Sequence, residues 1–222
     1  MPASARNAIM TIYNDKASEY INQVFVQQDA AQRQAMEETP RRGLPAINIK
    51  PEEGRFLQML VRASGAKKVV EIGTLGGYSG IWIARGLAPG GRLITLEKEP
   101  YHAQVAREHF AAAGVEGLID LRLGDAHQSL KDMVAEGPFD FVFVDAEKPG
   151  YNRYLDWAIE NVRSGGIIAV HNAFRKGSVF GQAADDDYSE LMRAFNRRVA
   201  EDERLLSTVY PAGDGMLISV KL

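Results

Sequence analysis

The sequence contains no cysteine among its 222 residues, which excludes disulfides, thiol nucleophiles and zinc sites built on cysteine. No apolar run approaches the roughly 18 residues that a membrane-spanning helix needs. The N-terminal segment also lacks the apolar core of a secretion signal. These absences predict a cytoplasmic protein that does not cross a membrane.

The chain also has no excess of positive charge. The net charge is −3 and the isoelectric point is about 5.9, so no overall basic field attracts nucleic acid. Hydrophobic residues make up 45% of the chain and charged residues 25%. At this length, such a composition predicts a globular protein whose core needs no disulfide or structural metal.

From residue 67 onward, short apolar segments alternate with amphipathic ones. This alternation predicts an α/β fold, in which helices cover both faces of a parallel sheet. Two further strands, joined by the turn "PAGDG", predict an antiparallel hairpin at the end of the chain. The expected strands are residues 67–73, 92–97, 119–124, 139–145, 167–172, 205–210 and 216–222. The expected helices are residues 77–87, 101–114, 125–137, 151–166 and 185–203.

The first part of the chain departs from this alternation. Residues 14–38 have the apolar spacing of a helix, whereas residues 39–54 are rich in proline and glycine and predict a loop. Pro51 suits the first turn of another helix. We therefore distinguish an N-terminal helix and loop, residues 1–50, from a main part, residues 51–222, within one structural domain.

Polar residues stand where several of the strands end. Ligands of doubly wound sheets bind beyond the carboxyl ends of the strands, at the point where the strand order reverses. We therefore expect the functional site among these strand ends. They are Glu71–Gly73, Glu97, Gly124–Asp125, Asp145 and His171–Asn172.

The first three strand ends have the order of a nucleoside site. The glycines of "GTLGG" (Gly73–Gly77) let a ligand approach the backbone closely, or they serve tight packing. Glu97 can accept both hydroxyls of a ribose, or it is an exposed strand end. Asp125 and Ala126 can lie along an adenine, or Asp125 caps a helix. The spacing is not G-x-G-x-x-G, which argues against a nicotinamide oxidoreductase.

In that order, these motifs resemble those of class I S-adenosylmethionine-dependent methyltransferases. "DAEKPGY" from Asp145 and "GGIIAVHNAF" from Gly165 are similar to the cation-dependent O-methyltransferases related to catechol and caffeoyl-CoA O-methyltransferases, bacterial members above all. The resemblance runs from about Pro51 to the end of the chain. It implies a Rossmann-like, doubly wound sheet of seven strands, the last antiparallel. The implied activity is methyl transfer from S-adenosylmethionine to a hydroxyl of a small catechol-like or phenolic acceptor.

The resemblance also implies a set of cofactor-binding residues. The backbone of Ile49 would contact the methionine part of the cofactor, and Ser79 would hold its carboxylate near a helix N-terminus. Glu97 would bind the ribose, and Ala126 the adenine edge. The other members of the set are Glu71, Gly73, Thr74, Asp125 and Asp145.

In the family, a divalent cation is held by Asp-Asp-Asn, and here the matching residues are Asp145, His171 and Asn172. Histidine in place of aspartate leaves three interpretations open. His171 ligates a metal and favours Mn, Fe, Co, Ni or Zn over Mg. Alternatively, the metal is lost and His171 or Lys148 takes the substrate proton. In the third interpretation, His171 is a spacer that bonds to backbone.

Catalysis requires the acceptor hydroxyl to be deprotonated, because a phenol has a pKa near 10. Lys148 matches the general-base lysine of the family, and Asp145 and His171 complete the expected catalytic set. Burial beside a positive charge can lower the pKa of a lysine enough for this role. The aromatic residues Tyr151 and Tyr154 are predicted to pack in the core.

Other expectations concern partners. The segment 175–187, together with the N-terminal helix, is expected to cap the acceptor pocket, and the apolar face of that helix suits a homodimer. Two rival functions remain: methylation of a hydroxylated uridine in transfer RNA, and S-adenosylmethionine binding without catalysis. The lack of a basic tract argues against the first, and retention of Lys148, Asp145 and Asn172 argues against the second.

Overall fold

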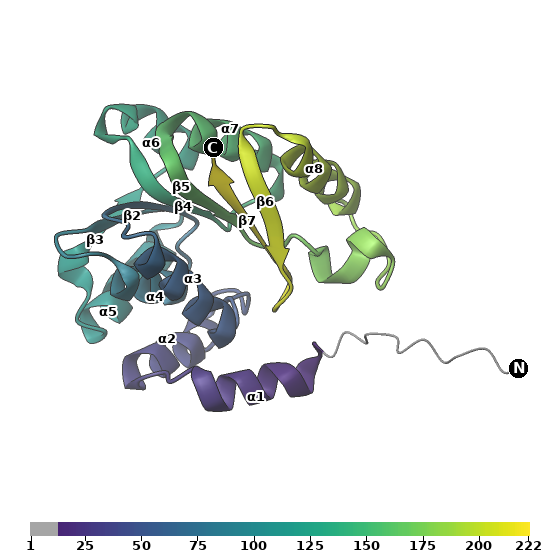
Figure 1. Ribbon diagram of the computed structural model, residues 1–222. Helices are drawn as coiled ribbons and strands as arrows, with labels where there is room; N and C mark the ends of the chain where they lie inside the picture. The colour runs from purple at the N-terminus through teal and green to yellow at the C-terminus, as the bar shows by residue number, and fades with distance from the viewer. Residues whose placement is uncertain (1–12) are drawn as a thin grey trace, which may run out of the picture.

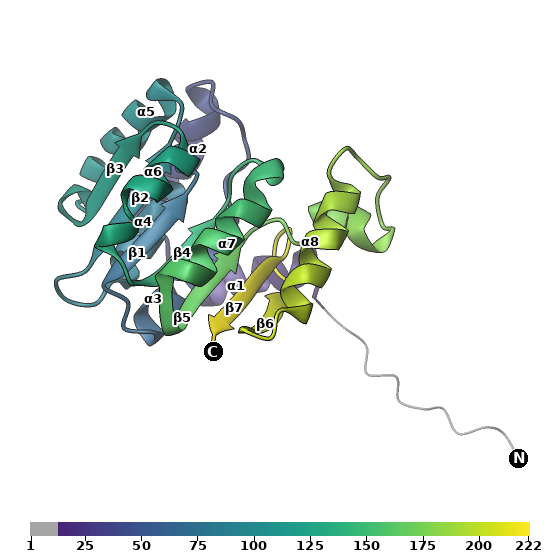
Figure 2. The same ribbon diagram turned by 90° about the horizontal axis from the view of Figure 1, so that it is seen from above.

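The computed structural model describes residues 13–222, in which a seven-stranded sheet lies between two layers of helices (Figures 1 and 2). The strand order is β3-β2-β1-β4-β5-β7-β6; β7 is antiparallel to both its neighbours, and the other pairs are parallel. This confirms the expected doubly wound fold with its antiparallel last strand. The strands are β1 (Lys68–Ile72), β2 (Arg92–Glu97), β3 (Ile119–Leu123), β4 (Phe139–Val144), β5 (Val162–Val170), β6 (Leu205–Tyr210) and β7 (Met216–Lys221).

The helices divide between the two faces of the sheet, each over its own apolar cluster. Helices α1 to α5 lie on one side and α6 to α8 on the other (Figure 2). The helices are α1 (Asp15–Phe25), α2 (Ala30–Arg41), α3 (Pro51–Ala63), α4 (Tyr78–Gly86), α5 (Pro100–Ala112), α6 (Ala126–Asp132), α7 (Tyr151–Asn161) and α8 (Ser189–Glu201). Short 3-10 turns are η1 (Glu116–Leu118), η2 (Val134–Glu136), η3 (Lys148–Gly150) and η4 (Arg175–Phe180).

The strand order reverses between β1 and β4. After β1 the chain moves outward through β2 to β3, and after β4 it moves outward in the other direction. In register, Ile72 pairs with both Leu96 and Val144, and Val144 pairs with Val170. The residues that follow these strands therefore meet at one edge of the sheet, as the doubly wound fold requires.

The structure corrects the single helix expected over residues 14–38. The chain forms two helices, and the break comes before Ala30 because Asp29 caps the second one. The Asp29 side chain accepts the N–H of Gln32 at 2.9 Å, and the Gln32 side chain accepts the N–H of Asp29 at 3.1 Å. Such a capping box satisfies two backbone donors at once and fixes the start of a helix. Helix α2 then continues through Pro40, past the expected start of the loop.

A second correction concerns the end of α7, which was expected at residue 166. The helix ends at Asn161 and β5 begins at Val162, five residues before the expected strand. Val162 pairs with Phe139 and Ile167 with Phe141, so the intervening residues form an irregular bulge. Gly165 lies there at φ +71°, a conformation open to glycine.

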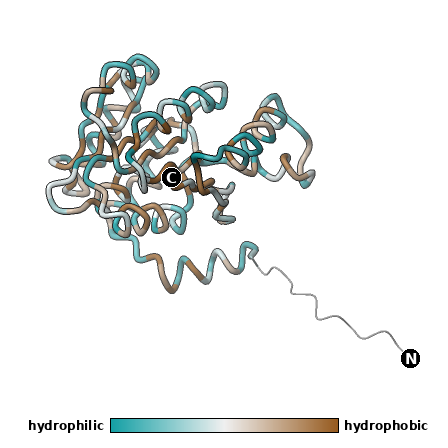
Figure 3. Tube along the Cα trace, turned by 45° about the horizontal axis from the view of Figure 1, so that its top comes forward, coloured by the Kyte–Doolittle hydropathy of each residue, from teal (hydrophilic) through white to brown (hydrophobic). Residues whose placement is uncertain are grey.

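Apolar residues gather around the sheet and recur along α1 (Figure 3). On α1, Tyr20 is 61% exposed and Phe25 is 63% exposed. These side chains are available for the expected homodimer, which stays a prediction. None of the helices between residues 13 and 222 has the length and apolar character required to cross a bilayer.

Candidate active site

A cavity of about 710 Å³ opens at the carboxyl ends of β1, β2 and β4. Its walls include the loop residues Ile47 and Ile49 on one side and Arg175 and Lys176 on another. The expected strand ends thus border one cavity. Of the predicted cofactor-binding set, eight residues line it: Ile49, Gly73, Thr74, Ser79, Glu97, Asp125, Ala126 and Asp145.

Gly73 brings the backbone of β1 against that of β4. Its φ is +97°, and a Cβ at this position would overlap the carbonyl oxygen of Asp145. Only glycine fits here without displacing Asp145. The glycine after the first strand therefore serves close packing of two strand ends beside a ligand cavity.

Glu97 is buried at the end of β2. Its carboxylate accepts the N–H of Leu75 at 2.8 Å and the N–H of Glu99 at 3.0 Å. The alternative of an exposed strand end is therefore wrong. The carboxylate is fixed by backbone donors on the cavity wall, as recognition of a ribose would require.

Glu71 is the exception in the cofactor-binding set, because it is fully buried beneath the cavity wall. It accepts the hydroxyls of Ser79 at 2.6 Å and Thr95 at 2.7 Å. Burial raises the pKa of Glu71 to about 7, although the two hydroxyl donors oppose the shift. Glu71 therefore orients Ser79 from below.

Asp125 has both of the roles that its sequence context suggested. It caps α6, where its carboxylate accepts the N–H of Gln128 at 2.9 Å, and it also lines the cavity. The next residue but one, His127, stacks on Tyr154 with ring centroids 4.5 Å apart. Both rings border the cavity, whereas Tyr154 was predicted only to pack in the core. Both residues follow a strand end in the sequence, and this position was the available signal that they border the cavity.

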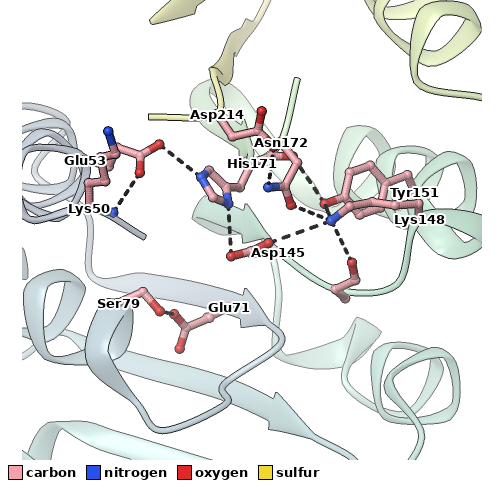
Figure 4. A network of polar contacts seen from close by, with 11 residues as sticks. Lys50, Glu53, Glu71, Ser79, Asp145, Lys148, Tyr151, His171, Asn172 and Asp214 are labelled. Carbon is pink, nitrogen blue, oxygen red and sulfur yellow. Dashed lines mark hydrogen bonds and ion pairs between the residues drawn. The ribbon is translucent and has the colours of Figure 1, made fainter. Parts of the chain in front are cut away.

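Lys148, in η3, lies at the other end of the cavity in a dense polar network (Figure 4). Its ammonium donates to Oδ1 of Asn172 at 2.5 Å, to the hydroxyl of Tyr151 at 2.6 Å and to the carbonyl of Ala146 at 3.0 Å. Burial lowers the pKa of Lys148, and the nearby carboxylate of Asp145 opposes this shift only in part. Tyr151, predicted as core only, is therefore also a polar partner of Lys148.

Asn172 connects this network to the turn between β6 and β7. Its backbone has φ +63°, and its side-chain amide donates to Oδ2 of Asp214 at 3.0 Å. Asparagine tolerates this left-handed conformation better than most residues. The predicted turn "PAGDG" thus supplies a partner, Asp214, for a predicted site residue.

His171 lies behind the cavity wall between two carboxylates (Figure 4). Nε2 is 3.0 Å from Oε1 of Glu53, and Nδ1 is 3.2 Å from Oδ2 of Asp145. Both ring nitrogens therefore face acids, so the interpretation of His171 as a spacer bonded to backbone is wrong. Glu53 was not predicted as a site residue, although two adjacent acids follow Pro51 in the sequence.

The two carboxylates determine the charge of the histidine ring. Burial opposes protonation, but Asp145 and Glu53 more than offset it and raise the pKa of His171 to about 10. Burial likewise opposes ionisation of Asp145, yet His171 and Lys148 hold its pKa below the ordinary value. In the absence of a bound metal, these shifts favour an aspartate beside an imidazolium.

The divalent cation that the resemblance implies would be held by Asp145, His171 and Asn172. A metal ligand must offer a lone pair; Nε2 of His171 bonds to Glu53, whereas its buried Nδ1 has no hydrogen-bond partner among the described residues. The oxygen of Asn172 accepts from Lys148 and keeps a second lone pair. Between residues 13 and 222, no group of three or more histidine and acidic side chains is placed to hold a metal ion.

The cavity does fit S-adenosylmethionine. The buried carboxylate of Glu97 suits the ribose hydroxyls, and the close approach at Gly73 leaves room beside Asp145. Ser79, near the N-terminus of α4, is placed for a carboxylate. These features agree with the roles that the resemblance assigned.

Comparison with known proteins points the same way. Residues 22–222 match the family model described as O-methyltransferase. The chain is 37% identical over 197 residues to a catechol O-methyltransferase of Niastella koreensis, covering 88% of this chain and 89% of the relative. It is 40% identical over 168 residues to a catechol O-methyltransferase of Mycobacterium tuberculosis, covering 76% of each chain.

Solved structures agree. An O-methyltransferase of Bacillus cereus in complex with SAH has a TM-score of 0.84 at 34% identity, over 93% of this chain and 97% of that one. One from Streptomyces achromogenes, involved in tomaymycin synthesis and in complex with SAM, also has a TM-score of 0.84, at 32% identity, over 93% and 96%. The chain therefore belongs to the S-adenosylmethionine-dependent O-methyltransferase family.

Proposed function

We propose that this enzyme methylates a hydroxyl of a small catechol-like or phenolic acceptor, with Lys148 as the general base and without a divalent metal. The observation that carries the proposal is the ammonium of Lys148, which lies in the cavity wall and contacts both Asn172 and Tyr151. The relatives named catechol O-methyltransferase support the acceptor class.

Lys148 has the properties of a base for a phenol. Burial lowers its pKa, which brings it closer to that of the hydroxyl it would deprotonate. In the neutral state, the amine still has Asn172 and Tyr151 as neighbours to hold it in position. General bases of this kind typically contribute about 10²–10⁴-fold to the rate.

Asp145 joins the two halves of the cavity. Its carbonyl packs against Gly73 on the cofactor side, and its Oδ1 is 3.9 Å from Nζ of Lys148 on the other side. S-adenosylmethionine supplies the electrophilic methyl group when bound. The protein then has to hold an acceptor oxygen in line with that group, and Asp145 and Asn172 are placed to orient its hydroxyls.

The experiment is methyl transfer by the purified protein to a panel of catechols, phenols and enols, followed by mass spectrometry. Each acceptor is assayed with chelator and then with added Mg²⁺, Mn²⁺, Co²⁺ or Zn²⁺. We expect O-methylation of at least one aromatic diol at a rate that chelator leaves unchanged. Titration with SAH runs in parallel, since cofactor binding without methylation of any acceptor contradicts the proposal. Bulk transfer RNA is a further arm, and methylation of it alone would also contradict it.

A further inference from the structure

His109 is a buried histidine that the site described above does not include. It lies on α5, is 2% exposed and does not line the cavity. We propose that His109 is a positioning residue of the cofactor site, which holds the turn of residues 74–77 in the shape that S-adenosylmethionine needs. The inference concerns the cofactor half of the cavity, so it does not depend on the acceptor or on the base of the proposed function.

The turn of residues 74–77 connects β1 to α4 and borders the cavity at Thr74 and Leu75. Leu75 has φ +50°, a left-handed conformation that leucine rarely adopts. Such a conformation persists only where the surrounding structure holds it. The carboxylate of Glu97 holds one side of the turn, where it accepts the N–H of Leu75 at 2.8 Å. The other side of the turn faces α5.

His109 supplies the contact on the side of α5. Its Nδ1 lies 2.7 Å from the carbonyl oxygen of Gly76. A carbonyl oxygen can only accept, so Nδ1 is the donor of this hydrogen bond. The N–H of the same peptide group belongs to Gly77 and donates to the carbonyl of Thr74 at 2.8 Å. This planar group therefore cannot rotate without losing two hydrogen bonds.

The same peptide group sets the start of α4. Gly77 is the N-cap of that helix, and Ser79 in its first turn lines the cavity. A Cβ at Gly77 would lie 2.6 Å from the ring of Phe110, the residue after His109. Rotation of the peptide group would therefore move Ser79 and the backbone N–H groups beside it, which suit a carboxylate.

Helix α2 packs on His109 and on the turn from outside. Oε2 of Glu38 is 3.3 Å from Nε2 of His109, the other ring nitrogen. Thr39 lies so close to Gly76 that a Cβ there would be 2.3 Å from the threonine hydroxyl oxygen. That hydroxyl donates to the carbonyl of Ala35 at 2.6 Å, so the threonine is itself fixed. The ring of His109 is thus held between the turn and α2, a helix that does not line the cavity.

The test is calorimetric titration of SAH into the full-length protein and two variants. His109→Leu removes the donor to Gly76, and we expect SAH to bind about three- to tenfold more weakly. His109→Asn keeps a donor, because its amide nitrogen is attached to Cγ as Nδ1 is, and should bind SAH within about twofold of the wild type. Wild-type affinity in His109→Leu would overturn the proposal. An equal loss in both variants would overturn it too, because the loss would then follow from packing and not from the hydrogen bond.

Val61→Ala is the control for a loss of stability alone. Val61 is buried in the same apolar cluster as Phe110, but it lies beside Gly86, at the far end of α4 from the turn. This variant should unfold at a lower urea concentration and bind SAH as the wild type does. A loss of SAH affinity as large as that of His109→Leu would contradict a specific role for His109.

A second measurement covers the case in which His109→Leu does not fold. Nitrogen-15 spectra of the wild-type histidine side chains, assigned by replacing the other three histidines one at a time, report whether Nδ1 of His109 carries hydrogen. We expect it to do so, and its hydrogen should exchange with water more slowly when SAH is bound, because SAH stabilises the turn that the bond holds. A bare Nδ1, or an exchange rate that SAH leaves unchanged, would overturn the proposal. Neither readout needs an acceptor, so failure of the methylation assay alone would overturn only the proposed function.

Discussion

Nζ of Lys148 lies 2.5 Å from Oδ1 of Asn172, the oxygen that the family resemblance assigns to a metal. A lysine head group thus holds the side chain that would otherwise help to coordinate a cation. The relationship joins the expected base to the expected acceptor-binding residue. It also makes Lys148 the first residue to test.

Replacing Lys148 should separate chemistry from binding. We expect Lys148→Met to lower kcat by about 10²–10⁴-fold, because the base is lost. Lys148→Arg keeps the positive charge but cannot release a proton near neutral pH, so it should be equally inactive. Calorimetric titration with SAH should give affinities close to that of the wild type for both. Activity retained by Lys148→Arg would contradict the role of the lysine as a base.

The pH profile follows from the same residue. Lys148 is active as a base only when neutral, and burial lowers its pKa below the ordinary value of 10.5. The value of kcat should therefore rise with pH and level off below about pH 10.5. Measurement from about pH 6 to 10 checks this. A wild-type profile without a rising limb would exclude titration of Lys148 during turnover.

Glu97 should govern affinity for the cofactor. Its carboxylate faces the cavity and accepts from the backbone of Leu75 and Glu99. Glu97→Gln converts one acceptor oxygen into a donor, so we expect SAH binding to weaken by about 1.5–3 kcal/mol, a factor of more than ten. Glu116→Gln, on the surface in η1, is the matched control and should leave the affinity unchanged. Equal affinities for the two variants would exclude a role for Glu97 in the cofactor site.

Glu53→Gln should destabilise the fold by about 1.5–3 kcal/mol, because a charged hydrogen bond to His171 is lost. Urea denaturation measures the difference. The pKa of His171 is raised from 6.5 to about 10, so the stabilisation is complete below about pH 6.5 and is lost as pH rises through about 10. The gap between wild type and variant should shrink over that range.

Glu52→Gln provides the comparison for this variant. Glu52 is also buried, but it bonds to Ser18 and Asn22 of α1 and not to the histidine. Its effect on stability should therefore not follow the titration of His171. The same pH dependence in both variants would contradict the pairing of Glu53 with His171.

Gly213→Ala tests the space that the β6–β7 turn leaves for Glu53. An added Cβ would meet the Glu53 carboxylate, so this variant should lose both stability and activity. Gly43→Ala is a matched control, since Gly43 also has positive φ (+82°) but no neighbour within 4 Å of the added Cβ. Both variants carry the backbone strain of about 1–2 kcal/mol. Only Gly213→Ala should lower kcat. Equal effects of the two variants on stability and kcat would contradict a contact between position 213 and the Glu53 carboxylate.

The fold was largely predictable because apolar runs and glycine-rich turns are local signals. All seven expected strands are present, although β5 begins five residues earlier than expected, and the cavity lies at the predicted strand ends. The failures were also local in origin. The capping box at Asp29 interrupts a helix that apolar spacing alone predicts to be continuous. The bulge at Gly165 lets β5 begin nearer the N-terminus than expected.

The partner of His171 was not predictable by the same means. Glu53 stands 118 residues earlier in the chain, and only the packing of α3 on the end of the sheet brings the two together. The order of strand ends places His171 beside Asp145 and Asn172 but carries no signal for Glu53. The role of His171 therefore stayed open, because it depends on a residue from another part of the chain.

The two halves of the cavity differ in the length of chain that each must close. On the cofactor side, Glu97 bonds to Leu75, 22 residues away, and Glu71 to Thr95, 24 residues away. On the acceptor side, Glu53 must meet His171 across 118 residues. The longer closure costs about 1.5 kcal/mol more in chain entropy. We therefore expect the contact between Glu53 and His171 to form later in folding than the contacts of Glu97 and Glu71 on the cofactor side.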